Sequence, residues 1–195
     1  MADNPKTLSP GAKGGTLAAV VGLLSATLLL VETPKEESGR TVQATVATDG
    51  TAMVRHVSGP QYLSAYRDIA GVPTACDGIT QGVEMGQHYT EAQCGALLEA
   101  ELTKHARGVM RCTPPLAEPG RDYQRVAAVL LAYNIGVGGY CGSTVARRFN
   151  AGEWRAGCDA FDMWNKARVN GVLRPVAGLT ARRGRERAIC LKGLA

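Results

Sequence analysis

The sequence predicts a mostly α, α+β protein, in which a domain with a small β lobe follows one N-terminal transmembrane-type helix. Three observations lead to this fold class. Residues 14–31 carry no charge, residues 65–80 have the glycine, proline and β-branched content of short strands and turns, and residues from 90 onward repeat apolar positions at helical spacing. A chain of 195 residues accommodates one sizeable domain plus an appendage.

The uncharged N-terminal run, GGTLAAVVGLLSATLLLV, has 18 residues and is just long enough to span a hydrocarbon layer as a helix. Lys6 and Lys13 precede it, which predicts that the N-terminus stays in the cytoplasm while the remainder is exported. A cleavable signal peptide is the alternative, although its apolar region usually has about 7 to 15 residues. Half of the run is small or weakly polar, so such a helix would be held only loosely in lipid.

Composition divides the chain into three parts. Residues 1–31 form the membrane-targeting segment, residues 32–52 are predicted to be a polar linker with room for a short strand or helix turn, and residues 53–195 form the domain. At the start of the domain, residues 53–59 are expected to end a short helix, and the small β element follows at residues 65–80.

The rest of the domain is predicted to be helical. One helix begins after Thr90, because Thr90 and Gln93 form a capping box ahead of an apolar face. A second helix is apolar almost all round and is expected to be buried and to stop at Gly136. Two more helices are predicted at residues 150–164 and 179–191.

Cysteine content and charge bear on compartment and partners. An even number of cysteines in an exported chain favours disulfides, but six cysteines allow 15 pairings and the sequence does not choose among them. No metal site or cofactor is expected, because no CxxC pair or Cys/His cluster occurs. The segment from residue 53 onward has 18 Lys and Arg against 12 Asp and Glu, a net charge of +6 that attracts polyanions. Export argues against nucleic acid as the partner.

Four blocks in the domain carry a family pattern. Asp68 and Thr74 stand six positions apart in AYRDIAGVPTACDGIT, where Asp68 alone would be explained as a turn residue. The blocks YTEAQC, AYNIGVGGYCGSTVARRFNAGEW and GLTARRGRERAIC follow in order. With these blocks, the chain resembles the phage-type lysozymes, glycoside hydrolase family 24, and within them the signal-arrest-release endolysins. The resemblance covers roughly residues 53–192.

The resemblance implies a lysozyme-like domain that hydrolyses the β-1,4 bond between N-acetylmuramic acid and N-acetylglucosamine of peptidoglycan during host lysis. It implies that Asp68 places or activates a water molecule and that Thr74 orients this water. It also implies that the N-terminal segment attaches the chain to the host inner membrane before the chain reaches the periplasm. The expected partners are therefore peptidoglycan and the inner membrane.

The chain departs from the family at the catalytic glutamate. The family motif is Glu, eight residues, Asp or Cys, five residues, Thr, and counting back nine from Asp68 gives Gly59. No carboxylate lies between Asp49 and Asp68. A general acid must protonate the departing glycosidic oxygen, so either another group has taken this role or the chain is a catalytically impaired lysozyme-like protein that binds peptidoglycan without cleaving it.

Three side chains are candidate substitute acids. Asp77 comes first, because it stands three residues after Thr74 in the same β element. Glu84 lies farther along in a loop, and His56 precedes Gly59 by three positions and titrates near neutral pH.

Other family-like positions have structural explanations. Ile79 stands where the family often has a histidine that supports the fold. Asn134 is expected to bond backbone amides at its helix end. The last helix is interpreted as a solvated face in which arginines pair with an acid; its residues are Arg182, Arg183, Arg185 and Glu186.

Overall fold

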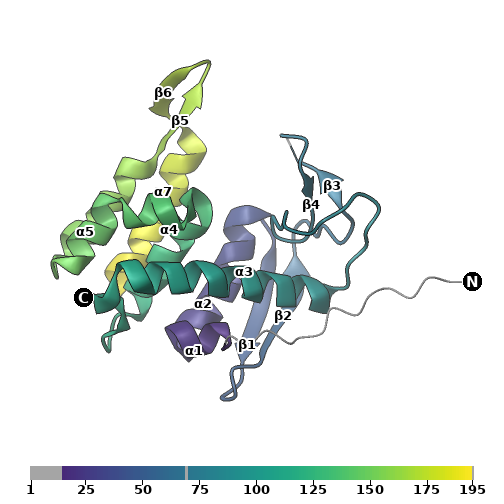
Figure 1. The fold of residues 1–195 in the computed structure, drawn as a ribbon, viewed down its shortest axis with the longest axis horizontal. Coiled ribbons are helices and arrows are strands. Elements are labelled where there is room, and N and C mark those ends of the chain that lie inside the picture. Colours follow the sequence, from purple (N-terminus) through teal and green to yellow (C-terminus); the bar gives the residue numbers. More distant parts are fainter. Residues whose placement is uncertain (1–14, 69, 195) are drawn as a thin grey trace, which may run out of the picture.

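The computed structural model describes residues 15–68 and 70–194. It confirms a mostly helical α+β fold with small sheets (Figure 1). The first elements are α1 (Leu17–Val21), α2 (Leu23–Glu37), β1 (Thr41–Val46), β2 (Ala52–Ser58), β3 (Tyr66–Arg67) and β4 (Pro73–Thr74). The others are α3 (Glu91–Cys112), η1 (Pro114–Ala117), α4 (Asp122–Cys141), α5 (Thr144–Asn150), α6 (Trp154–Asp159), η2 (Ala160–Trp164), β5 (Lys166–Val169), β6 (Val172–Pro175) and α7 (Ala177–Lys192).

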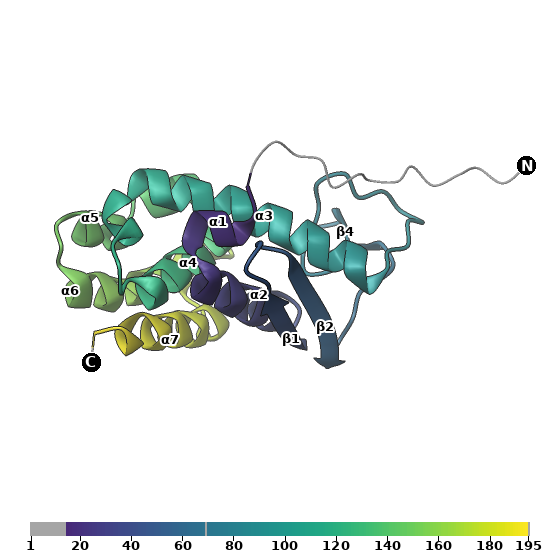
Figure 2. The same cartoon turned by 90° about the horizontal axis from the view of Figure 1, so that it is seen from below.

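The strands pair only as neighbours along the chain, in three two-stranded antiparallel sheets: β1–β2, β3–β4 and β5–β6. Figure 1 shows α3 running from the β3–β4 side of the molecule into the helical body, and Figure 2 shows the β1–β2 hairpin beside α2. Cys94, near the start of α3, packs in the small core of the β lobe, whereas Leu98 and Leu102 on the same helix belong to the main core. One helix therefore joins both cores.

The N-terminal apolar run differs from the predicted single transmembrane-type helix. It forms two helices, α1 and α2, because Gly22 between them has φ +83°. Leu17, Leu29 and Leu30 are at most 1% exposed and lie in the main hydrophobic core. No single helix in the described part of the chain is long and apolar enough to cross a membrane, and one bent pair, α4 with α5, qualifies by length and composition only. The flanking Lys6 and Lys13 lie outside the described residues.

The predicted domain boundaries fall inside secondary structure. The boundary after residue 31 lies within α2, and the boundary after residue 52 lies within β2. Residues 32–52 are therefore the last turn of α2, β1 and a tight turn, and not a linker. Residues 53–59 do not end a helix, because residues 53–58 belong to β2, where Val54 and His56 are half-buried and their neighbours in the strand are exposed. This alternation with a period of two is the signal of a half-buried strand.

The predicted helices are present. The capping box of Thr90 and Gln93 begins α3 as expected. Gly136 interrupts α4 as expected, because its φ of +79° is not helical, and a second helical part follows it up to Cys141. The segment at 150–164 divides into α6 and η2, and the last basic helix is α7.

Three disulfides link the elements of the fold, which confirms the predicted disulfide-bonded state and selects one of the possible pairings. Cys76–Cys94 joins the β lobe to α3, Cys112–Cys141 joins the ends of α3 and α4, and Cys158–Cys190 joins α6 to α7. Each closes a loop of between 18 and 32 residues. Loops of that length correspond to about 3 to 4 kcal/mol of stabilisation each in a chain-entropy account.

We expect Leu30→Ala to lower the free energy of unfolding by about 2 to 5 kcal/mol, because Leu30 is fully buried in the main core and the substitution leaves a cavity. Leu24→Ala is the matched control on the same helix, since Leu24 is 49% exposed, and it should change stability by about 0.5 kcal/mol or less. Chemical denaturation measures both. Equal effects of the two substitutions would mean that α2 does not belong to the core in solution.

Candidate active site

The β3–β4 hairpin brings the two motif residues Asp68 and Thr74 onto one short loop. Asp68 Oδ1 accepts hydrogen bonds from the backbone N–H groups of Ala70 and Val72 at 2.9 and 2.8 Å. Asp68 Oδ2 has no hydrogen-bond partner in the described part of the chain, and the side chain is half-buried. Thr74 is 3% exposed, and its hydroxyl donates to the carbonyl oxygen of Val72 at 3.0 Å. The loop thus holds one oxygen of Asp68 and leaves the other unbonded.

Asp77, the first candidate for a substitute acid, lies in an unsuitable environment. Its side chain is fully buried, and its two oxygens accept from Arg40 Nε and Nη2, each at 2.7 Å. Ser38 Oγ donates to Asp77 Oδ1 at 2.9 Å. Both oxygens of Asp77 are thus occupied by donors, and the fully buried side chain is closed to a substrate oxygen. The geometry therefore argues against Asp77 as the proton donor.

The other two candidates are not better placed. Glu84 lies in an exposed turn before α3, where its backbone N–H is bonded to Gln87. His56 lies on β2, and its Nδ1 is buried without a hydrogen-bond partner among the described residues. Neither side chain belongs to the β3–β4 loop that carries Asp68.

Gly59, the position that the family motif assigns to the glutamate, cannot carry a side chain without rearrangement. Gly59 has φ +89°, and a Cβ there would lie 2.8 Å from the carbonyl oxygen of Gly39 and 2.9 Å from Cα of Arg40. The two ends of the β1–β2 hairpin therefore touch at this point. The chain leaves the end of α2, forms the hairpin and returns to almost the same place.

This return places Glu37, which the sequence analysis missed, beside the β lobe. Glu37 ends α2, and its Oε2 lies 3.9 Å from the position of a Cβ on Gly78, the residue after Asp77. Its Oε1 accepts from Arg182 Nη2 at 2.7 Å, and the side chain is 21% exposed. The sequence spacing contained a signal for Glu37. Asp68 follows Glu37 by 31 positions, of which residues 40–59, the hairpin and its two ends, account for 20. Without the hairpin, the separation would be 11 positions, close to the nine positions between Glu and Asp in the family motif.

Glu36, the neighbouring carboxylate, is differently engaged. Both of its oxygens accept from Arg185 on α7, at 2.6 and 2.7 Å, and its side chain is 4% exposed. Only Glu37 of this pair keeps a carboxylate oxygen without a hydrogen-bond partner among the described residues.

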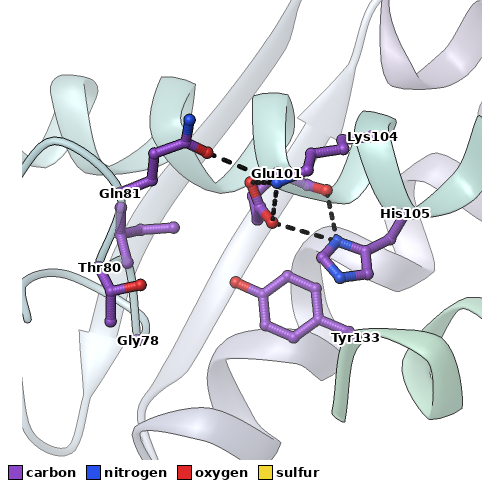
Figure 3. Close-up of a pocket in the computed structure, with 8 residues that line it drawn as sticks. Gly78, Thr80, Gln81, Glu101, Lys104, His105 and Tyr133 are labelled. Carbon is purple, nitrogen blue, oxygen red and sulfur yellow. Dashed lines mark hydrogen bonds and ion pairs between the residues drawn. The ribbon is translucent and has the colours of Figure 1, made fainter. Parts of the chain in front are cut away.

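A pocket of about 290 Å³ opens next to Gly78 (Figure 3). One wall is the loop of residues 78–81, and the other comes from α3 and α4. Glu101 of α3 lies between Lys104 Nζ at 3.2 Å and His105 Nδ1 at 3.4 Å, as Figure 3 shows. The lining residues are Gly78, Ile79, Thr80, Gln81, Glu101, Lys104, His105 and Tyr133. The pocket is thus polar on the α3 side, and Ile79 faces it where the family often has a histidine.

Tyr133 connects this pocket to Asp77. Its hydroxyl donates to the backbone carbonyl oxygen of Asp77 at 3.4 Å, and its ring packs 5.0 Å from that of His105. Burial raises the pKa of Tyr133 well above its usual range, with nearby carboxylates adding to the shift. The phenol therefore stays neutral and remains a hydrogen-bond donor across the pH range in which proteins fold.

The last helix, α7, is only in part the solvated face that its composition suggested, since Arg185 is exposed but the other three predicted residues are not. Arg182, Arg183 and Glu186 are buried, and Glu186 Oε1 accepts from Arg182 Nε at 3.1 Å and from Arg183 Nη2 at 2.8 Å. Arg183 also donates to the side-chain oxygen of Asn134 at 3.0 Å, in place of the backbone amides expected for Asn134. Burial raises the pKa of Glu186 to about 7, against the opposing effect of the two arginines. The predicted pairing with Glu186 is present, but it is buried.

Comparison with known proteins identifies the family. The sequence profile described as phage lysozyme matches residues 59–186. The chain belongs to the phage lysozyme family. This membership makes it a glycoside hydrolase of the muramidase type and confirms the lysozyme-like fold. The matched range begins at Gly59, so the β1–β2 hairpin and Glu37 precede it.

Individual relatives are similar over most of their length. A SAR-endolysin of Pseudomonas phage phiKMV is 39% identical over 130 residues, which cover 66% of this chain and 78% of that protein. A SAR-endolysin of Enterobacteria phage P21 is 35% identical over 151 residues, covering 77% and 87%. Among solved structures, an endolysin from Escherichia coli O157:H7 phage FAHEc1 superposes with a TM-score of 0.61 at 32% identity, over 68% of this chain and 84% of that one.

We expect Gly59→Ala to destabilise the fold and Gly59→Glu to create no new activity, because position 59 combines a positive φ with contact to Gly39 and Arg40. Gly120→Ala is the matched control: Gly120 has φ +77° but no atom within 4 Å of the added Cβ, so it should cost about 1 to 2 kcal/mol. Denaturation midpoints should show a larger cost for Gly59→Ala. An increase in lytic rate for Gly59→Glu would instead restore position 59 as the place of the acid.

Proposed function

We propose that this chain is an endolysin that hydrolyses the β-1,4 bond between N-acetylmuramic acid and N-acetylglucosamine in the peptidoglycan of the host, with Glu37 as the general acid. Membership of the phage lysozyme family and the similarity to two SAR-endolysins support the substrate and the reaction. The single observation that carries the assignment of Glu37 is its position at the end of α2, with one bonded and one unbonded oxygen beside the β lobe.

Glycosidic bond hydrolysis usually needs two carboxyl groups, one to protonate the leaving oxygen and one to act from the other face of the sugar. Glu37 supplies the first group: Arg182 orients its Oε1, and its Oε2 is left for the substrate. Asp68 supplies the second group, with Oδ1 fixed by the loop and Oδ2 available to place or activate water. Thr74 orients that water through its hydroxyl, which keeps acceptor capacity while it donates to Val72.

The wall-binding, catalytically impaired alternative depended on the absence of an acid near Asp68. Glu37 supports the cleaving enzyme instead, because the two ends of the hairpin that separates it from the motif meet in space and its Oε2 lies 3.9 Å from the position of a Cβ on Gly78.

We expect Glu37→Gln to lower the rate of peptidoglycan clearing by about 10²- to 10⁴-fold, the usual effect of removing a proton donor. Glu36→Gln is the isosteric control at the adjacent position and should retain the rate within a few-fold, because Glu36 is committed to Arg185. Asp68→Asn should also reduce the rate strongly. Circular dichroism and melting temperature confirm that each variant is folded.

Two results would overturn this proposal. If Glu37→Gln clears peptidoglycan as fast as the parent, another group is the acid. If the parent sediments with peptidoglycan but releases no reducing ends, the chain is the non-cleaving binder.

The proposed route to the substrate passes through the inner membrane to the periplasm. Three disulfides support an oxidising compartment. The apolar run at residues 14–31 supports attachment to the membrane, and in the folded domain its residues Leu17, Leu29 and Leu30 lie in the core instead. The run would therefore hold the chain at the membrane first and join the domain after release, so that wall cleavage follows refolding.

We expect the full-length chain to fractionate with membranes in energised cells and to move to the soluble periplasmic fraction after the membrane potential is collapsed. Loosely held apolar runs rich in small residues favour such release. Replacing Gly14 and Gly15 by Leu is the control, because it increases lipid affinity without changing the break at Gly22 and should retain the chain in the membrane. A parent chain that stays in the membrane after collapse would exclude release.

A further inference from the structure

The β1–β2 hairpin is an excursion between the proposed acid and the Asp68–Thr74 loop. It lies outside residues 59–186, the part matched by the phage lysozyme profile. Its ends meet where Gly59 approaches Gly39 and Arg40. The hairpin therefore leaves and rejoins the domain at one point, directly after Glu37.

The base of this hairpin holds a fully buried ion pair. Arg40 is 2% exposed, and its Nε and Nη2 donate to the two oxygens of Asp77 at 2.7 Å each. Ser38, between Glu37 and Arg40, donates to the same carboxylate at 2.9 Å. The chain just after Glu37 is thus tied at two residues to one side chain of the β lobe.

Asp77 is itself held in place. It follows Cys76, which is bonded to Cys94 of α3, and its backbone carbonyl oxygen accepts from Tyr133 of α4. It precedes Gly78, and a Cβ placed on Gly78 would lie 3.9 Å from Oε2 of Glu37. Asp77, which α3 and α4 hold in place, therefore holds the chain at the end of α2 through its bonds to Ser38 and Arg40.

We propose that Arg40 and Asp77 form a positioning pair that sets the place and orientation of the Glu37 carboxylate relative to the β lobe, and that the β1–β2 hairpin delivers Arg40 to this position. The inference rests on the proposed role of Glu37. Neither residue touches the substrate, and no proton passes between them.

Two physical arguments favour positioning over simple stabilisation. A bidentate guanidinium–carboxylate pair fixes both distance and direction, which a single contact does not. A fully buried ion pair adds little net stability, since desolvation of both charges offsets their attraction, and apolar residues of similar volume often serve as well. A misplacement of about 1 Å at a catalytic group, in contrast, can cost about 10²-fold in rate.

The test is a double-mutant cycle in the full chain with Arg40→Met, Asp77→Leu and the double variant. Each single change leaves a buried charge unpaired and should lower the melting temperature, whereas the double variant should recover most of it. For the double variant we expect kcat on purified peptidoglycan to fall by about 10- to 100-fold with KM within about 3-fold of the parent. The alkaline limb of its pH–rate profile should also shift, because the surroundings of Glu37 change.

Arg55→Met is the matched control in the same hairpin, since Arg55 is exposed and bonds only to Gln43 among the described residues. It should keep the parent kcat and pH profile. Arg40→Lys provides a second variant if the double variant does not fold, because it keeps the charge but loses the bidentate geometry. It should remain folded with kcat reduced about 10-fold or more.

A folded double variant, or a folded Arg40→Lys variant, with the parent kcat and pH profile would overturn the inference and leave the pair a structural contact. Glu37→Gln separates this result from failure of the proposed function. If Glu37→Gln is inactive while the pair variants are fully active, only the positioning role fails; if Glu37→Gln is active, the assignment of the acid fails as well.

Discussion

The docking of α2 in the main core is the interaction on which the site depends. Its apolar residues, including Leu29 and Leu30, are buried against the helical body, and this burial brings the last turn of the helix to the junction of α7 and the β lobe. There Arg185 and Arg182 bind Glu36 and Glu37, and Asp77 binds Ser38 and Arg40. The hydrophobic effect supplies the attachment, and the charged contacts supply the direction.

The composition of the apolar N-terminal run suits two environments, the membrane and the core of the folded domain. A run that is apolar enough to enter lipid is also apolar enough to fill a protein core, because both remove the same side chains from water. In the core, the break at Gly22 divides the run into two helices that fit around α3 and α4. The proposed active site is complete only in this second environment, since Glu37 belongs to α2.

Much of the fold followed from pattern. The capping box at Thr90, the apolar stripe of α3 and the apolar circumference of α4 are local signals, and each predicted its helix. The errors have a common cause. The strand at residues 52–58 and the depth of Arg182 and Arg183 depend on what packs against them, and neighbours from distant parts of the chain are not visible in a local window. Gly136, in contrast, interrupts its helix as the sequence predicted, because its φ of +79° is not helical.

The site shows the same division between sequence and structure. Asp68 and Thr74 were identified from the sequence, because a short hairpin keeps their spacing constant. Glu37 was not, because the β1–β2 hairpin separates it from the motif and defeats counting along the chain. The sequence also did not determine the disulfide pairing, because six cysteines allow 15 pairings. Nor did it identify the side chain that pairs with Asp77. By itself, the sequence determined the family, the helices and half of the candidate site; only the tertiary structure decided which carboxylate faces Asp77 and Gly78, because that depends on where the two ends of the hairpin meet.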